Sequence, residues 1–153
     1  MSMLPAKDIT LERLHAVFAS SGVAARVVEY SPATAHSARD AVLSVDYPED
    51  RSVHIWPEEH ETGNHLWMRS IVFDRIQRDE IPEDVWLDAA AYLNQNADCF
   101  GALSVRGLHG VTVEYLLPFQ DGVLEETVRL AAERVARGTS LAREEILGAL
   151  DDQ

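Results

Sequence analysis

The chain has 153 residues, of which 46% are hydrophobic and 25% are charged. That length fits one domain, and a folded chain of this size buries roughly 70% of the surface that its unfolded form exposes. Thirteen basic residues stand against 26 acidic ones, giving a formal net charge of −13. Nucleic acids are bound through clusters of Lys and Arg, so this composition argues against direct nucleic-acid binding. Instead, such an acidic surface attracts cationic partners.

Two further features bear on where the protein works. Residues 1–7 contain no apolar core of a signal peptide, and no apolar run approaches the roughly 20 residues that cross a bilayer. We therefore expect a cytoplasmic protein that makes no membrane contact. Cys99 is the single cysteine, so the fold does not depend on an internal disulfide. Its place between a helix and a strand favours a small apolar role over that of a nucleophile.

The first half of the chain predicts one helix followed by antiparallel strands. The helix is expected over residues 10–21, with Gly22 as its left-handed stop. Residues 31–39 and the acidic segment 58–64 are predicted loops, and residues 48–51 a hairpin turn. The strands expected before the middle helix lie at residues 23–30, 42–47, 52–56 and 66–73. The last of these carries apolar residues on both faces, which indicates a central strand or one covered by a second subunit.

The clearest order of elements lies between Pro82 and Pro118. Proline followed by two carboxylates suits the first turn of a helix, because proline lacks only an N–H that would be unpaired there and acids complement the helix dipole. This helix is expected to end near Asn96. Two strand-like runs at residues 100–106 and 111–117, joined by residues 107–110, then predict a hairpin.

The predicted middle helix carries apolar residues on two faces. Its main stripe comprises Val85, Trp86, Ala89, Tyr92, Leu93 and Asn96. The opposite face, where a solvent-exposed helix would be charged, holds Leu87, Ala90, Ala91 and Asn94. We expect this helix to be buried on both sides, its second neighbour being the C-terminal helix or the same helix of a second copy. We predict a homodimer and assign the dimer or partner interface to Trp86, Leu87, Ala90, Ala91 and Asn94.

The C-terminal segment predicts one long helix. Apolar residues from Val123 to Leu150 stay in phase through Gly138, which favours one long helix, straight or kinked at Gly138, over two short helices. Such a helix would be about 40 Å long, enough to reach a neighbouring subunit. The chain is thus expected to form a single α+β domain over residues 8–150. An antiparallel sheet of about six strands would be combined with an N-terminal, a middle and a long C-terminal helix.

This order of elements resembles the YbjN-type domain of bacteria. The resemblance lies in a helix ending Tyr92-Leu93-Asn94-Gln95-Asn96, then a hairpin whose last strand ends Leu117-Pro118, then the long helix. YbjN-type domains are similar in fold to the type III secretion chaperones, so the resemblance implies a chaperone-like, often dimeric, protein-binding fold. It singles out Asn94 and Asn96, for which we favour hydrogen bonds that end the helix over contacts with a partner.

One group of residues invites a catalytic interpretation. Its members are His54, Glu58, Glu59, His60, Glu61 and His65. A zinc-protease helix places two histidines four residues apart, whereas His60 and His65 are five apart with a glycine between them. Nucleophile-elbow and phosphate-loop motifs are also missing from the sequence. We therefore predict no catalytic residues, no metal site and no cofactor.

The leading functional hypothesis is a non-catalytic adaptor or chaperone-like protein that binds another protein. An apolar groove or a sheet edge would receive the partner. The net charge of −13 favours a partner with a basic surface, and a DNA-binding protein is one such partner. Two alternatives stay open at this point. One is a ligand-sensing regulatory domain, and the other is a small metal-dependent hydrolase that uses residues 54–65.

Overall fold

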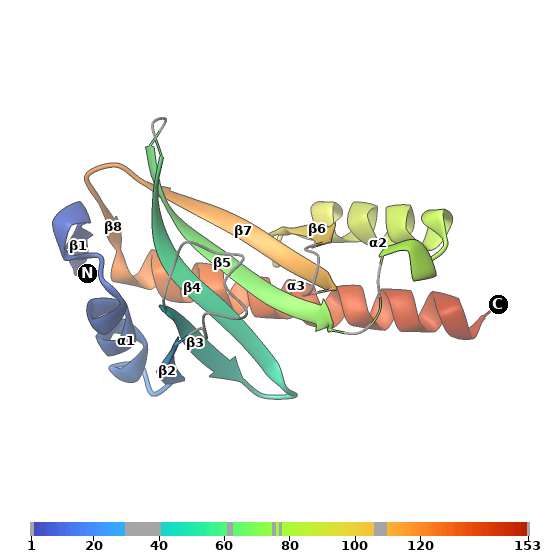
Figure 1. Ribbon diagram of the computed structural model, residues 1–153, viewed down its shortest axis with the longest axis horizontal. Coiled ribbons are helices and arrows are strands. Elements are labelled where there is room, and N and C mark those ends of the chain that lie inside the picture. Colours follow the sequence, from blue (N-terminus) through green and yellow to red (C-terminus); the bar gives the residue numbers. More distant parts are fainter. Residues whose placement is uncertain are drawn as a thin grey trace.

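An antiparallel sheet forms the centre of the molecule (Figure 1). The structure is a computed structural model that describes residues 2–29, 41–60, 63–74, 76, 78–105 and 110–152. Within these residues the main sheet has six strands in the order β2-β3-β4-β5-β7-β6, each antiparallel to its neighbours. The strands are β2 (Ala24–Glu29), β3 (Ala41–Tyr47), β4 (Arg51–His60), β5 (Gly63–Phe73), β6 (Ala102–Val105) and β7 (Val111–Phe119).

Helices and a second, small sheet complete the described part of the chain. The α-helices are α1 (Leu11–Ala19), α2 (Glu83–Gln95) and α3 (Glu125–Asp151), and two short 3-10 helices are η1 (Ala6–Asp8) and η3 (Arg78–Glu80). The small sheet pairs β1 (Met3–Pro5) with β8 (Gly122–Leu124), which ties the N-terminus to the start of α3. The predicted α+β class, with an antiparallel sheet of six strands and a long C-terminal helix, is confirmed.

Local signals account for the ends of α1. Thr10 is its N-cap, and the Oγ1 atom of Thr10 accepts a hydrogen bond of 3.2 Å from the backbone N–H of Arg13. This bond satisfies one of the amides that the first helical turn leaves unpaired. The helix stops before Gly22, whose φ of 78° lies in the left-handed region as predicted. Leu14, Val17 and Phe18 are the buried residues of α1.

The β3–β4 hairpin forms where it was predicted, but the predicted loop over residues 58–64 was wrong. There β4 continues to His60 and β5 begins at Gly63, with Glu58 opposite His65. Among the described residues, the part of β4 from Pro57 onward pairs only with β5, because the pairing of β4 with β3 ends at Ile55. Within these residues it lies at a sheet edge, where proline and acidic side chains are tolerated. The predicted loop at residues 31–39 and the turn residues 107–109 lie outside the described residues.

One face of the main sheet is covered by α1 and α3, and the core lies between the sheet and these two helices. Alternate strand residues such as Val45, Ile55 and Met68 are fully buried there against Phe18 of α1 and Val135 of α3. The strand β5 is central, since it lies between β4 and β7, and this is one of the two arrangements that its sequence indicated. Its other alternation, which includes Trp67 and Arg69, points to the opposite face of the sheet.

The long helix α3 is continuous through Gly138, so the prediction of one helix is confirmed. Gly138 is buried, and a Cβ atom added to it would lie 3.2 Å from the carbonyl oxygen of Phe100. One turn earlier, the carbonyl oxygen of Arg134 accepts a hydrogen bond of 3.2 Å from the backbone N–H of Phe100. The glycine therefore marks the place where the chain leading into β6 passes close to α3.

Candidate protein-interaction surface

Helix α2 begins at Glu83 and lies on the second half of α3, beyond the end of β5 (Figure 1). Pro82 is the N-cap, and its carbonyl oxygen accepts the first helical hydrogen bond, of 3.0 Å, from Trp86 N–H. Val85, Ala89 and Leu93 are the buried residues of this helix and belong to the main core cluster. The inner face of α2 is thus covered by α3, one of the two neighbours expected from the sequence.

The outer face of α2 carries four of the five residues predicted to form an interface. Leu87 is 57% exposed, Ala91 and Asn94 are exposed, and Ala90 is partly exposed. Their spacing of three and four residues places them on one stripe. The fifth residue, Trp86, is half-buried and packs against the core. The described part of the chain therefore leaves this stripe, hereafter the α2 outer face, open to a second molecule.

The two asparagines at the end of α2 have different places. The Oδ1 atom of Asn96 accepts a hydrogen bond of 3.0 Å from Asp98 N–H, and its carbonyl oxygen accepts one of 3.1 Å from Cys99 N–H. Asn96 thus holds the turn into the next strand, which is the structural role favoured from the sequence. Asn94 instead lies exposed on the α2 outer face.

Aromatic and charged side chains meet on the sheet face opposite α3. The Trp56 and Trp67 rings, directly opposed on β4 and β5, stack with centroids 5.6 Å apart, and Arg69 lies 5.0 Å from the Trp56 ring centroid. Trp67 Nε1 donates a hydrogen bond of 2.8 Å to Glu114 Oε1 on β7. Trp56 is only 2% exposed, which supports a structural role for this group. Glu114 was not singled out from the sequence, where its sole signal was its place in the alternation of β7.

The histidine-rich segment does not bring its members to one point. His54 pairs with Arg69 and Glu58 pairs with His65, so the two histidine rows lie four residues apart along β4, or about 13 Å. The side chain of His60 and residue Glu61 lie outside the described residues. Among the residues that the structure describes, no group of three or more His, Cys, Asp or Glu side chains is placed to hold a metal ion.

Cys99 is 8% exposed at the junction of α2 and β6. Burial raises the pKa of its thiol above the ordinary value, and Asp98 adds to this effect while Arg137 opposes it. A raised pKa keeps the sulfur in the thiol form, which is the less nucleophilic form.

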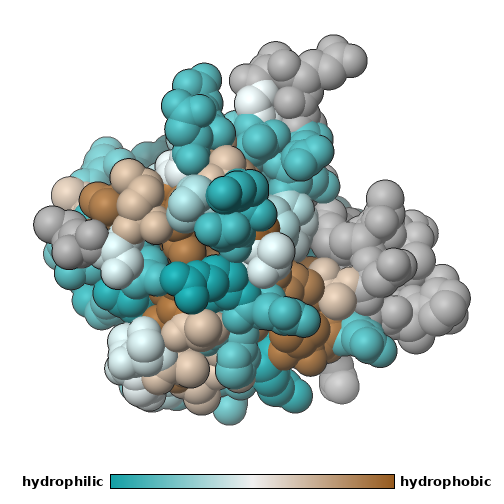
Figure 2. Space-filling model, turned by 90° about the vertical axis from the view of Figure 1, so that its left-hand side faces the viewer, coloured by the Kyte–Doolittle hydropathy of each residue, from teal (hydrophilic) through white to brown (hydrophobic). Residues whose placement is uncertain are grey.

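The remaining surface is mainly hydrophilic on the side that can be followed in Figure 2. This view shows the end of the molecule that carries α1 and β1, where hydrophobic side chains form small separate patches among hydrophilic ones. In the described ranges, no helix combines the length and the apolar composition needed to cross a membrane.

No protein-family model matches the sequence, and no curated protein matches it either. The resemblance to YbjN-type domains accordingly stays a prediction.

Proposed function

We propose that the protein is a cytoplasmic, non-catalytic adaptor that binds another protein and forms a homodimer through the α2 outer face. The observation that carries this proposal is that face itself. Leu87, 57% exposed, lies beside Ala90 and Ala91 on a helix whose other side is already packed on α3. A helix that merely faces solvent would carry charged residues on that stripe.

The dimensions of α2 suit contact with a second copy. Its 13 residues span about 20 Å. Ala90 and Ala91 lie near its centre, so two helices crossing there bring their backbones close together. In an antiparallel pair, Leu87 of each copy would lie near Asn94 of the other. The acidic first turn, Glu83 and Asp84, would then lie beside the C-terminal end of the partner's helix and apart from the acidic first turn of the partner. One self-complementary stripe is sufficient for such a two-fold contact.

Charge and resemblance support the adaptor part of the proposal. A net charge of −13 attracts a protein with a basic surface over a distance of about 8 Å at physiological salt. A DNA-binding protein is one partner with such a surface. The order of elements that resembles YbjN-type domains and secretion chaperones favours protein binding over catalysis. No single contact among the described residues defines the partner, so the proposal specifies the partner by its charge alone.

The dimer is tested by light scattering on the wild type, Leu87→Glu and Leu130→Glu. Leu87 and Leu130 are both exposed helical leucines, at 57% and 44%, so the two variants introduce the same charge in similar settings. We expect Leu87→Glu to be a monomer with unchanged helix content, and Leu130→Glu to remain a dimer. A monomeric wild type would refute the dimer, and dissociation by both variants alike would refute the assignment to α2.

The adaptor role is tested by affinity capture from a lysate of the source cells, treated with nuclease, at about 0.15 M and about 0.5 M salt. We expect one basic protein to be enriched in a stoichiometric amount at the lower salt and lost at the higher salt. Capture with Leu87→Glu as the bait shows whether the partner binds only to the dimer. If neither salt concentration yields an enriched protein while the bait is folded, the adaptor role is wrong.

A further inference from the structure

A pocket of about 580 Å³ lies where the end of α1, the β3–β4 turn and the first half of α3 meet. Its volume is in the range of small-molecule sites. The apolar part of its lining consists of Phe18, Val23, Pro48 and Ala136. The polar part consists of Ser21, Tyr47, Arg51, Arg129, Glu133 and Arg137. No residue of the α2 outer face belongs to it, so it is separate from the proposed interface.

The fold brings these charges together for identifiable reasons. Arg129, Glu133 and Arg137 follow one another at intervals of four residues, which places them on one face of α3. Arg51 is directly opposite Tyr47 in the β3–β4 hairpin, whose turn lies beside that face. Three arginines and one glutamate leave two net positive charges in the pocket lining. The whole chain, by contrast, carries −13.

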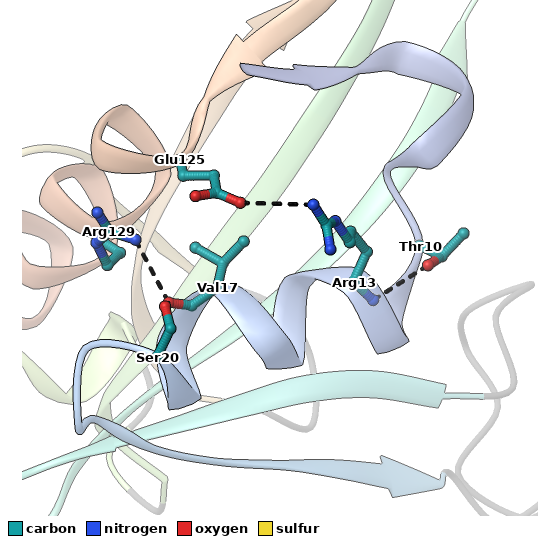
Figure 3. Close-up of polar contacts among 6 residues, drawn as sticks. All are labelled: Thr10, Arg13, Val17, Ser20, Glu125 and Arg129. Atoms are coloured by element: carbon teal, nitrogen blue, oxygen red, sulfur yellow. Dashed lines mark hydrogen bonds and ion pairs between the residues drawn. The ribbon is translucent and has the colours of Figure 1, made fainter. Parts of the chain in front are cut away.

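Two of the three arginines are held in place by carbonyl oxygens and not by carboxylates. Arg129 Nη1 donates a hydrogen bond of 3.4 Å to the carbonyl oxygen of Val17 at the end of α1 (Figure 3). Arg51 Nε donates one of 2.8 Å to the carbonyl oxygen of Pro48. In the described part of the chain neither of them forms an ion pair, whereas Arg137 pairs with Glu133 at 3.4 Å. Because each guanidinium has five N–H donors, most donors of Arg51 and Arg129 are left for a ligand.

Tyr47 adds a neutral donor to this lining. Burial, with a smaller contribution from Glu133, raises the pKa of its hydroxyl above the ordinary value, and Arg51 opposes the shift. The hydroxyl is protonated at neutral pH and is a donor for a ligand's oxygen atoms. The bond from Arg129 to Val17 holds the end of α1 and the bond from Arg51 to Pro48 holds the β3–β4 turn, but neither of them involves the Tyr47 hydroxyl.

We propose that this pocket binds a small organic phosphate monoester. Arg51, Arg129 and Arg137 would hold the phosphate group, and the apolar part of the molecule would lie against Val23 and Pro48. A phosphate monoester carries about −1.5 to −2 charges at pH 7, which matches the two net positive charges of the lining. Guanidinium groups bind phosphate oxygens through paired N–H donors, so arginine suits this task better than lysine. The inference goes beyond the adaptor role and does not depend on it.

The probe is phenyl phosphate, measured by isothermal titration calorimetry on the full chain. Inorganic phosphate supplies the charged group alone, and benzoate supplies the ring with a single negative charge. We expect phenyl phosphate to bind with one site per chain and more tightly than either of the other two. Failure of phenyl phosphate to bind would overturn the proposal. Equal affinity for benzoate would overturn the assignment of a doubly charged group.

Variants locate the site. Arg51→Gln and Arg129→Gln should each weaken binding about tenfold or more, because a hydrogen bond to a charged group is lost. Glu133→Gln removes a repelling carboxylate and should tighten binding about threefold or more. Arg26→Gln is the matched control, since Arg26 is 70% exposed on β2, pairs with Asp46 at 3.5 Å and is absent from the pocket lining.

Arg26→Gln lowers the net charge by the same amount as Arg51→Gln or Arg129→Gln and should leave the affinity unchanged. If it weakens binding as much as Arg129→Gln does, the affinity reflects overall charge and the pocket assignment is wrong. The side chain of Glu133 is 55% exposed, so Glu133→Gln keeps the test valid even where an arginine variant fails to fold. Unchanged binding by Glu133→Gln would contradict the proposed site. Leu87→Glu should bind phenyl phosphate as the wild type does, which separates this proposal from the dimer.

Discussion

Two glycines of α3 provide a test of how α3 contacts the chain leading into β6. Gly148 is exposed and has no other atoms within 4 Å of the position of an added Cβ. A Cβ at Gly138 would instead lie 3.2 Å from Phe100 O, 3.5 Å from Leu93 Cδ1 and 3.6 Å from Cys99 Cβ. Both residues are inside one helix, so replacement by alanine makes the same change in helix propensity at the two sites.

The expected free energies follow from these contacts. Alanine is favoured over glycine in a helix by about 1 kcal/mol, so Gly148→Ala should stabilise the protein by up to about that amount. Gly138→Ala gains the same amount but places a methyl group against Phe100 O. The Phe100 backbone is fixed by its bond to Arg134 O, and overpacking of a tight site costs about 1–3 kcal/mol. We expect Gly138→Ala to be net destabilising by about 1 kcal/mol.

Urea denaturation of the wild type and both variants measures the difference, provided that the slope m stays constant. The two free-energy changes should differ by about 2 kcal/mol, with opposite signs. If Gly138→Ala stabilises the protein as much as Gly148→Ala does, the Phe100 backbone does not lie against α3, and close packing is not the reason for a glycine at position 138.

Two further stability predictions concern α1 and Tyr47 in the pocket that is proposed to bind phosphate. Thr10→Ala removes the N-cap bond to Arg13 N–H (Figure 3) and should lower the free energy of unfolding by about 1 kcal/mol, whereas Thr10→Ser should retain most of it. Equal losses in the two variants would contradict the cap. Tyr47→Phe should make the unfolding free energy less dependent on pH above about 10, because it removes a hydroxyl whose pKa is raised in the folded state.

The sign of the Tyr47 effect follows from proton binding. Between the ordinary pKa of 10.0 and the raised folded value, the unfolded chain has lost the proton that the folded chain keeps. Stability from this group is therefore fully present below pH 10 and falls, by at most about 1.4 kcal/mol per pH unit, as the pH rises through that window. Urea titrations at several pH values between about 8 and 11 compare the two proteins. Parallel pH profiles would show that burial does not perturb this tyrosine.

Much of the fold could be predicted because its signals are local. Thr10 and Gly22 are separate signals that act within one turn of the chain, and they bracket α1 as expected. The β3–β4 turn places Glu49 and Asp50 at positive φ values of 67° and 56°, and acidic turn residues of this kind are visible in sequence. The outer stripe of α2 could likewise be found from its period of three to four residues.

Features that depend on distant pairing escaped prediction. The pairing of β1 with β8 joins residues that are far apart in the sequence, such as Met3 and Leu124, and three residues per strand leave no periodic signal. From Glu58 to His60, β4 was taken for a loop because acidic residues dominate it locally, whereas its pairing with β5 decides its conformation. The pocket proposed to bind phosphate joins Arg51 to Arg129, and neither arginine stands out in the sequence.

Helix α3 contributes to both proposed sites. At 27 residues it is about 40 Å long, which exceeds what the strands of the sheet need for cover. The first half faces the sheet and supplies the pocket through Arg129, Glu133 and Arg137. The second half carries α2 beyond the sheet, so that the α2 outer face points away from the rest of the chain (Figure 1). A bend at Gly138 would change the place of α2 relative to the sheet. No bend is needed to explain the glycine. The close contact with Phe100 explains why a residue of low helix propensity lies within a continuous helix.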